Sequence, residues 1–275
     1  MFKTIAPIVW AFDCEWIPDA DGIRKVLNLP PELGEAECFK TLWERNGATS
    51  ENPEPYIKPL LCRVVSLAAV QRIHTLKGTK LGLMWLPKEN SPDASDAEQD
   101  VLVKFLDAVG QYKPQLVGYN SRHADLPVLW QRAFVHGLCL PEFSRRPEKP
   151  WEGVDYFSRS ESHIDLMDVL TFGERGAASP SLIELARLAG FPEKAYTGSV
   201  ASLWLERDMT EIIERCIVGA LTTYLAWLRM AHLGGFFTPQ QYRQETDLFT
   251  GMLEELAGQG YGFAKNYLAR WELKF

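Results

Sequence analysis

The sequence lacks paired cysteines. Its five cysteines are scattered over 275 residues, and none forms a C-x-x-C pair. An odd, unpaired set excludes a disulfide framework and a zinc-ribbon site, and it is typical of proteins in a reducing compartment. The five positions are Cys14, Cys38, Cys62, Cys139 and Cys216.

Long apolar runs are also missing. No stretch of 18 or more uncharged apolar residues occurs, so no membrane span is expected. The apolar run that begins at Ile5 is short and ends in acids, without the small-residue cleavage site of a signal peptide. We therefore predict a cytoplasmic location and no membrane partner.

Positive charge is scarce. The chain holds 29 lysines and arginines against 36 aspartates and glutamates, a formal net charge of −7. Proteins that coat nucleic acid electrostatically are usually basic, so any nucleic-acid contact here must be local. The cluster of Arg145, Arg146 and Lys149 is small and is interpreted as a solvated loop face.

The chain does contain a clear change of periodicity along its length. Apolar and alternating runs predict strands over 8–16, 60–70, 81–86 and 115–119. Helical spacing predicts helices over 35–46, 95–109, 126–136, 166–172, 180–189, 208–233 and 239–256. Strands first, then β-α alternation, then helices alone indicate a mixed sheet flanked by helices in the α/β class. Segments 17–59 and 139–161 are predicted as long insertions or loops, and 258–275 as a C-terminal tail.

Several residues predict where helices begin and end. The pattern Ser95 to Glu98 is that of a capping box, and Gly110 is expected to end the helix that follows. Asp125 is expected at the N-cap of the next helix, and Asp165 at the N-cap of a short one.

Two acids close the first strand. Asp13 and Glu15 are one residue apart, so on a strand their side chains point to the same face, roughly 7 Å apart. Placing two carboxylates on a buried face carries a desolvation penalty that a divalent cation such as Mg²⁺ or Mn²⁺ would offset. The alternative is a strand whose end simply reaches water.

A second polar group follows the strand at 115–119. Asn120, His123 and Asp125 stand in or just after the next turn, at the carboxyl end of a central strand, where α/β proteins place their sites. Several carboxylates on a rigid floor suit two-metal phosphoryl chemistry. The alternatives are a helix cap for Asp125 and a solvent-exposed turn for His123. We interpret His163 as a packing or strand-end residue and Asp165 as a cap.

These patterns together carry a family resemblance. The stretch 12–19 (FDCEWIPD) resembles the first motif of the DnaQ-like (DEDD, ribonuclease-H-like) 3′–5′ exonucleases. More narrowly, the chain resembles their predicted 3′–5′ exonuclease, DNA-polymerase-B-like branch. The later blocks stand in the family's order over residues 5 to 255: LVGYN at 116–120, DLPVL at 125–129, HIDLMDVL at 163–170, LARLAGFP at 185–192 and TYLAWLR at 223–229.

The resemblance implies a ribonuclease-H-like, mixed five-stranded sheet flanked by helices, in a domain over 1–257. It also implies Mg²⁺- or Mn²⁺-dependent, two-metal removal of nucleotides from the 3′ end of single-stranded nucleic acid. By position in the motifs, the catalytic and metal-binding residues would be Asp13, Glu15 and Asp125, and the candidate substrate-binding residues are Asn120, His123 and Arg215.

The third motif departs from the family pattern. Where the family has Tyr-Cys-x-x-Asp, this chain has Arg215 at the tyrosine position and Gly219 at the acid position. We expect Arg215 to approach Asp13 and Glu15 and to replace part of the missing metal charge. Two functions stay open: an exonuclease with weakened activity, or a catalytically inactive module that binds nucleic acid or a protein partner.

Overall fold

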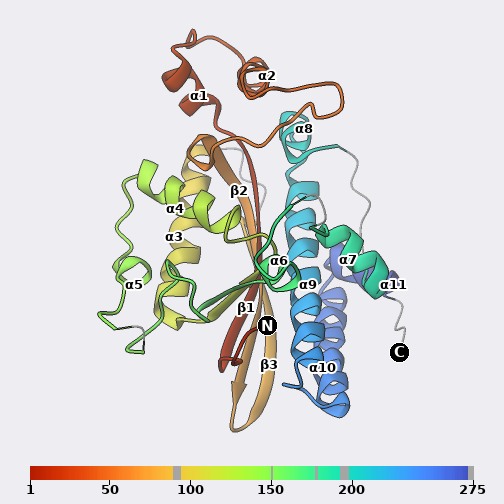
Figure 1. Cartoon of the computed structure of the whole chain (residues 1–275). Helices are drawn as coiled ribbons and strands as arrows, with labels where there is room; N and C mark the ends of the chain where they lie inside the picture. Colours follow the sequence, from red (N-terminus) through yellow and green to blue (C-terminus); the bar gives the residue numbers. More distant parts are fainter. Residues whose placement is uncertain (89–93, 150, 177–178, 193–197, 272–275) are drawn as a thin grey trace.

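A five-stranded mixed sheet forms the centre of the computed structural model, which describes residues 1–88, 94–149, 151–176, 179–192 and 198–271 (Figure 1). The strands are β1 (Ile8–Pro18), β2 (Cys62–Thr75), β3 (Gly78–Leu86), β4 (Gln115–Gly118) and β5 (His163–Asp165). Their order is β3-β2-β1-β4-β5; β2 is antiparallel to β1 and β3, while β1, β4 and β5 are parallel. This order confirms the predicted ribonuclease-H-like α/β class.

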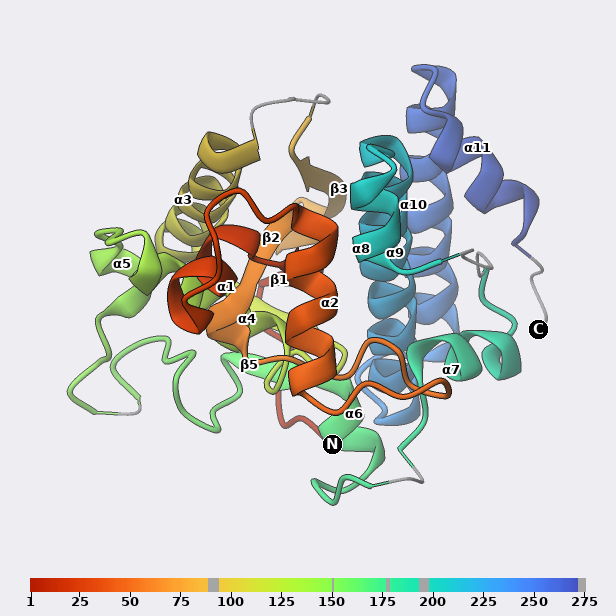
Figure 2. The ribbon, with the colours of Figure 1, turned by 90° about the horizontal axis from the view of Figure 1, so that it is seen from above.

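Helices cover both faces of the sheet. One face carries α3, α4 and α5, and the other carries α7, α9, α10 and α11 (Figure 1). Seen from above, α1 and α2 lie over the end of the sheet where β1 finishes (Figure 2). The bounds are α1 (Ala20–Leu27), α2 (Glu35–Arg45), α3 (Ala94–Tyr112), α4 (Asp125–Val135), α5 (Pro141–Ser144), α6 (Leu166–Leu170), α7 (Leu182–Ala189), α8 (Val200–Leu205), α9 (Met209–Leu233), α10 (Pro239–Gly258), α11 (Gly262–Ala269) and the 3-10 turn η1 (Pro59–Leu61).

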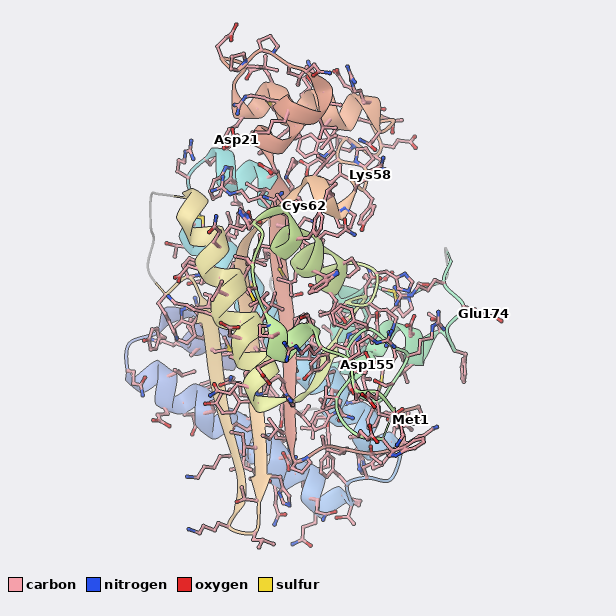
Figure 3. All side chains as sticks on the ribbon, turned by 90° about the vertical axis from the view of Figure 1, so that its left-hand side faces the viewer. Met1, Asp21, Lys58, Cys62, Asp155 and Glu174 are labelled. Atoms are coloured by element: carbon pink, nitrogen blue, oxygen red, sulfur yellow. The ribbon has the colours of Figure 1, made fainter. Side chains whose placement is uncertain are left out.

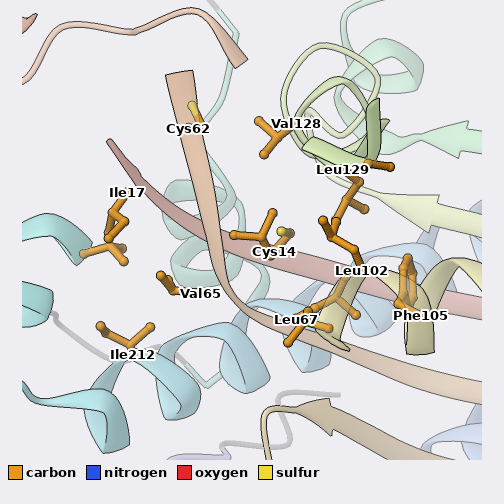
Figure 4. Packing of buried hydrophobic residues seen from close by; sticks show 14 of the residues in the cluster. Cys14, Ile17, Cys62, Val65, Leu67, Leu102, Phe105, Val128, Leu129 and Ile212 are labelled. Atoms are coloured by element: carbon orange, nitrogen blue, oxygen red, sulfur yellow. The ribbon is translucent and has the colours of Figure 1, made fainter. Parts of the chain in front are cut away.

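Alternation along β1 decides which side chains enter which layer. Cys14 points toward Leu102 and Phe105 of α3 and Leu129 of α4, as Figure 4 shows. Neighbouring strand residues point to opposite faces, so Asp13 and Glu15 face α9. Each large apolar side chain buried in these layers contributes about 1.5–3 kcal/mol to the free energy of unfolding.

Helix α9 is the main cover of the second face. By length and composition it could cross a membrane, and 78% of its most apolar window is buried inside the protein. Tyr224 and Trp227 are fully buried there, and Tyr224 stacks on Phe249 of α10 with ring centroids 5.4 Å apart. The helix therefore packs as the core helix of a globular domain.

Helix α3 does not begin with the expected capping box and does not end at Gly110. The helix begins at Ala94, and the Glu98 carboxylate accepts hydrogen bonds from the Val64 amide at 2.7 Å and from Arg132 at 2.8 Å, so it is not the partner of a capping box. Gly110 lies inside the helix. A Cβ there would stand 2.6 Å from the backbone nitrogen of Phe143, so the glycine permits close packing of α5 and does not end α3.

Two helix starts also differ from expectation. Asp125 is the first residue of α4, and Ala124 holds its N-cap position without a side-chain cap, so the capping role expected of Asp125 was wrong. α7 begins at Leu182, where Ser181 and Glu184 form a capping box, and not at Pro180. Asp165 does cap α6, accepting from the Met167 amide at 3.0 Å.

Some elements escaped the sequence patterns because they are short. These include α1 within 17–59, α5 within 139–161, α8, and α11 within the expected tail. α11 packs on α10 through the buried Phe263 and Tyr267. The segment after α2 returns to the sheet near α4; Figure 3 labels Lys58 within it and Cys62 at the start of β2. All five cysteines are free, as predicted.

Candidate functional site

The middle of β1 holds the first two acids against α9, and the strand continues for three residues beyond Glu15, so the acids do not close it as expected. In the pairing with β2, Asp13 stands opposite Ala68 and Glu15 opposite Ser66, and the register shifts directly after Glu15. Both acids are partly buried beneath the helix, and the Glu15 side chain is 15% exposed. The strand thus places two carboxylates on a rigid floor, on one face and facing one helix, as the D-x-E spacing predicted.

Gly219 of α9 lies directly on Asp13. A Cβ built on Gly219 would be 2.6 Å from the Asp13 Cγ and 3.2 Å from its Cβ, with the carboxylate oxygen Oδ2 nearer still. The Asp13 carboxylate therefore occupies the space into which any side chain at position 219 would project. In its present position Asp13 excludes an acid at 219.

Arg215 lies one helical turn before Gly219 and contacts the other acid of the pair. Its Nε is 3.2 Å from Glu15 Oε1, and its Nη1 donates to the Gly198 carbonyl at 3.3 Å. The arginine thus supplies a fixed positive charge at Glu15, as expected. The guanidinium cannot be deprotonated in a protein, so this charge is permanent.

The third acid, Asp125, comes from the first turn of α4. Its side chain is 4% exposed, and its Oδ1 is buried without a hydrogen-bond partner among the described residues. A buried carboxylate oxygen without a partner is unfavourable unless the group is protonated or binds a cation. This orphan oxygen is the strongest local sign of a missing ligand.

Burial and mutual repulsion shift the pKa values of the three acids. Burial, with the charges of Glu15 and Asp125, raises the pKa of Asp13 well above its usual value. Burial raises the pKa of Glu15 to about 7 although Arg215 lowers it, and burial raises the pKa of Asp125 to about 8 with help from the charges of Glu15 and Asp165. Burial thus disfavours the charged form of each acid, and a bound cation would stabilise that form.

The turn after β4 is held by Asp165. Its carboxylate accepts from the backbone nitrogens of Asn120 and Arg122, each at 2.9 Å, and pairs with Arg175 at 2.7 Å. Arg175 also donates to the side-chain oxygen of Asn120, which has a φ of +61°. Sequence reasoning missed Arg175 because it lies in a loop without any motif, ten residues from the carboxylate that it contacts.

The two histidines near the site behave as interpreted. His123 is exposed in the turn before α4. His163 is buried in β5, where its Nε2 is 2.8 Å from the Ser121 hydroxyl, and burial lowers its pKa to about 3. His163 is therefore a neutral packing residue at the pH of the cell.

The donor set fits one divalent cation. Mg²⁺ is commonly held by one or two carboxylates together with water and substrate phosphates, and Asp13 and Asp125 offer carboxyl oxygens whose charged form a bound cation would stabilise. Within the described ranges no three His, Cys, Asp or Glu side chains are already arranged to hold a metal ion. A second cation does not fit, because Arg215 holds Glu15 and Gly219 supplies no ligand.

The fold and the placement of the acids define a ribonuclease-H-like domain of the exonuclease type. A sequence model of the predicted 3′–5′ exonucleases related to the exonuclease domain of PolB matches residues 54–271, so the chain belongs to this family. The matched part excludes β1, and the fold alone brings Asp13 and Glu15 to Asp125 and Arg215. A search of the curated proteins gives no match to the chain.

Proposed function

We propose that this exonuclease-like domain binds the 3′ end of single-stranded nucleic acid at a site with one divalent cation, and that it lacks two-metal phosphodiester hydrolysis. The family supplies the nucleic-acid substrate class. The proposed loss of two-metal hydrolysis rests on one observation, the contact of the Asp13 carboxylate with Gly219 beside the Arg215–Glu15 ion pair. Together these contacts fill the place of the second metal and its fourth carboxylate.

Asp13 and Asp125 would hold the cation, Mg²⁺ or Mn²⁺, in this proposal. A bound cation would polarise a phosphate oxygen and neutralise part of its charge. The chain's own contribution is a buried, rigid pair of carboxylates: β1 fixes Asp13, and the first turn of α4 fixes Asp125. Two ionised carboxylates at this depth favour a divalent cation over a monovalent one.

Arg215 would contribute to phosphate binding without replacing a metal's chemistry. A guanidinium can donate hydrogen bonds to a phosphate but cannot carry a water molecule to be deprotonated. His123 is exposed beside the site and is available to the nucleic-acid backbone. Asn120 would act indirectly, because its side-chain oxygen already accepts from Arg175 and its amide is held by Asp165.

Slow hydrolysis with a single cation is the second candidate function. The orphan Oδ1 of Asp125 favours it, because a carboxylate kept buried and unpaired is poorly explained by a purely structural role. In this case Asp13, Glu15 and Asp125 remain the catalytic set, and activity is weak because one metal position is filled by Arg215.

One pair of assays separates these candidates. Binding of a labelled single-stranded oligonucleotide is followed by fluorescence anisotropy with and without Mn²⁺, and release of nucleotides from its 3′ end is followed on a gel. Asp13→Ala is the control. Cation-dependent binding without release supports the first proposal, whereas release that is lost in Asp13→Ala supports the second. Absence of both binding and release contradicts both and leaves a protein partner as the remaining role.

A gain-of-function variant sharpens the test. Gly219→Asp alone is expected to crowd Asp13. The double variant Arg215→Tyr/Gly219→Asp removes the guanidinium from Glu15 and supplies the fourth acid at the same time. Both variants place a side chain against Asp13, so Asp13 must move in either; we expect only the double variant, in which Glu15 is also released from Arg215, to gain Mn²⁺-dependent release of nucleotides.

A further inference from the structure

A short segment, residues 54–58, is anchored on both the α9 side and the α4 side of the site and is called the strap below. Its first anchor lies on the α9 side. The Glu54 carboxylate accepts from the Ser199 hydroxyl at 2.7 Å, and the neighbouring Gly198 carbonyl accepts from Arg215. This end of the strap therefore stands beside the arginine that contacts Glu15.

The second anchor of the strap lies on the α4 side. The Tyr56 hydroxyl donates to the His123 carbonyl at 3.2 Å, two residues before Asp125. Ile57 is buried in the apolar layer that also holds Cys14 of β1. Because its two anchors lie on either side of the acids, the strap reaches from the Arg215 side of the site to the Asp125 side.

Two side chains of the strap are exposed. Tyr56 is 63% exposed although its hydroxyl is fixed, and Lys58 is also exposed, with Ile57 buried between them. Alternate residues of an extended segment point to the same side, so Tyr56 and Lys58 both point away from the core. None of the ion pairs among the described residues involves Lys58.

We propose that Tyr56 and Lys58 receive the 3′-terminal nucleotide, with the base stacked on the tyrosine ring and a phosphate on the lysine ammonium. This inference rests on the proposed function and names the residues that bind the end of the strand. An aromatic face beside a cation is the usual surface for single-stranded nucleic acid, and it tolerates any base.

The fixed hydroxyl separates this tyrosine from an ordinary exposed one. Scattered exposed apolar side chains are normal on protein surfaces. Tyr56, however, is held by a hydrogen bond at the edge of the site, so little side-chain freedom remains to be lost when a base binds. Its hydroxyl is hydrogen-bonded to the residue two positions before Asp125, which would hold the cation in the proposed function.

The experiment is a thermodynamic cycle between the ring and the base. Anisotropy with Mn²⁺ gives the affinity of the full chain for a single-stranded oligonucleotide and for the same strand with an abasic 3′-terminal nucleotide. The proteins are wild type, Tyr56→Ala, Tyr56→Phe and the control Tyr112→Ala, which removes an exposed tyrosine (53%) from the end of α3. Thermal unfolding checks that each variant is folded.

We expect Tyr56→Ala to weaken binding of the normal strand about fivefold or more, and to leave binding of the abasic strand unchanged. Tyr56→Phe keeps the ring but loses the hydrogen bond that holds it, so its affinity should lie between those of wild type and Tyr56→Ala, and Tyr112→Ala should bind as wild type does. Lys58→Gln should lower the salt dependence of binding by about 0.7 in log–log slope. The control Lys77→Gln, in the turn between β2 and β3, should not change it.

The experiment distinguishes failure of this inference from failure of the proposed function. If Tyr56→Ala binds both strands as wild type does, Tyr56 makes no contact with the terminal base and the inference is wrong, while the proposed function stands. If Tyr56→Ala weakens both strands equally, the tyrosine acts through the fold and stacking is refuted. If wild type binds neither strand, the proposed function fails and the inference fails with it.

Discussion

Replacing Gly219 by alanine tests the central contact of the site. Glycine inside a helix is about 1 kcal/mol less favourable than alanine, so the exchange would normally stabilise α9. Here the new Cβ would stand 2.6 Å from the Asp13 Cγ, whereas ordinary contact begins at 3.4 Å. The Asp13 side chain must retreat by about 0.8 Å or more, inside a packed layer.

The two effects oppose each other and the crowding should prevail. Overpacking of a core typically destabilises by about 1–3 kcal/mol. Subtracting the helix gain leaves Gly219→Ala destabilising by about 0–2 kcal/mol in the wild-type chain. In an Asp13→Ala background only the Cβ contact at 3.2 Å remains, so the same exchange should stabilise by up to about 1 kcal/mol.

Urea unfolding followed by circular dichroism measures this change of sign in wild type, both single variants and the double variant. Gly251→Ala is the matched control, because it lies in α10 and a Cβ there meets nothing within 4 Å. That exchange should stabilise by about 1 kcal/mol whether or not Asp13 is present. Equal stabilisation by Gly219→Ala and Gly251→Ala in the wild-type chain would falsify the close contact of Asp13 with α9.

Three further predictions concern the charges of the site. Arg215→Gln should lower the free energy of unfolding by about 1–2 kcal/mol at pH 8. The loss should be smaller at pH 5, because Glu15, with its pKa of about 7, then holds its own proton. The control Arg207→Gln replaces an exposed arginine and should change the free energy of unfolding by less than about 0.5 kcal/mol at either pH. The increase in melting temperature caused by Mn²⁺ should grow as pH rises from 6 to 9, because Asp125, with its pKa of about 8, must lose a proton before it can bind the cation. Asp125→Asn should remove this dependence on pH. An increase in melting temperature that is the same at every pH would contradict the prediction. The pKa of His163 is about 3 in the folded protein and about 6.5 in the unfolded chain, so its contribution to stability is present above pH 6.5 and is lost by about 1.4 kcal/mol per pH unit below it. Urea titrations between pH 7 and 4.5 should therefore show a steeper loss of stability for wild type than for His163→Gln. Parallel losses in the two proteins would show that the buried ring accepts a proton freely.

The resemblance of ordered blocks predicted the fold, and one acid pair followed from residue spacing. A strand that ends in D-x-E must place both acids on one face, whatever surrounds it, because strand periodicity is local. The cap at Asp165 was likewise predictable, since a capping side chain reaches only the next turn. The exchange of Tyr and Asp for Arg215 and Gly219 was visible in the sequence as a departure from the family pattern.

Other outcomes needed the packed structure, because they depend on residues far apart in the chain. Glu98 has the spacing of a capping box, yet a buried arginine 34 residues later offers it two charged hydrogen bonds, which are stronger than one amide contact. The position of Asp125 similarly predicted a cap, but the backbone made it the first helical residue and left its Oδ1 without a partner.

The sequence by itself determined which charges the site contains: three acids, one arginine, and no acid at position 219. Only the tertiary structure decided how these charges are arranged, because sheet pairing and the packing of α9 bring together residues about 200 positions apart. It placed Asp13 on Gly219 and Arg215 on Glu15, and it buried the Asp125 Oδ1 without a hydrogen-bond partner among the described residues. Composition therefore fixes which charged groups are available, and packing fixes which of them contact one another.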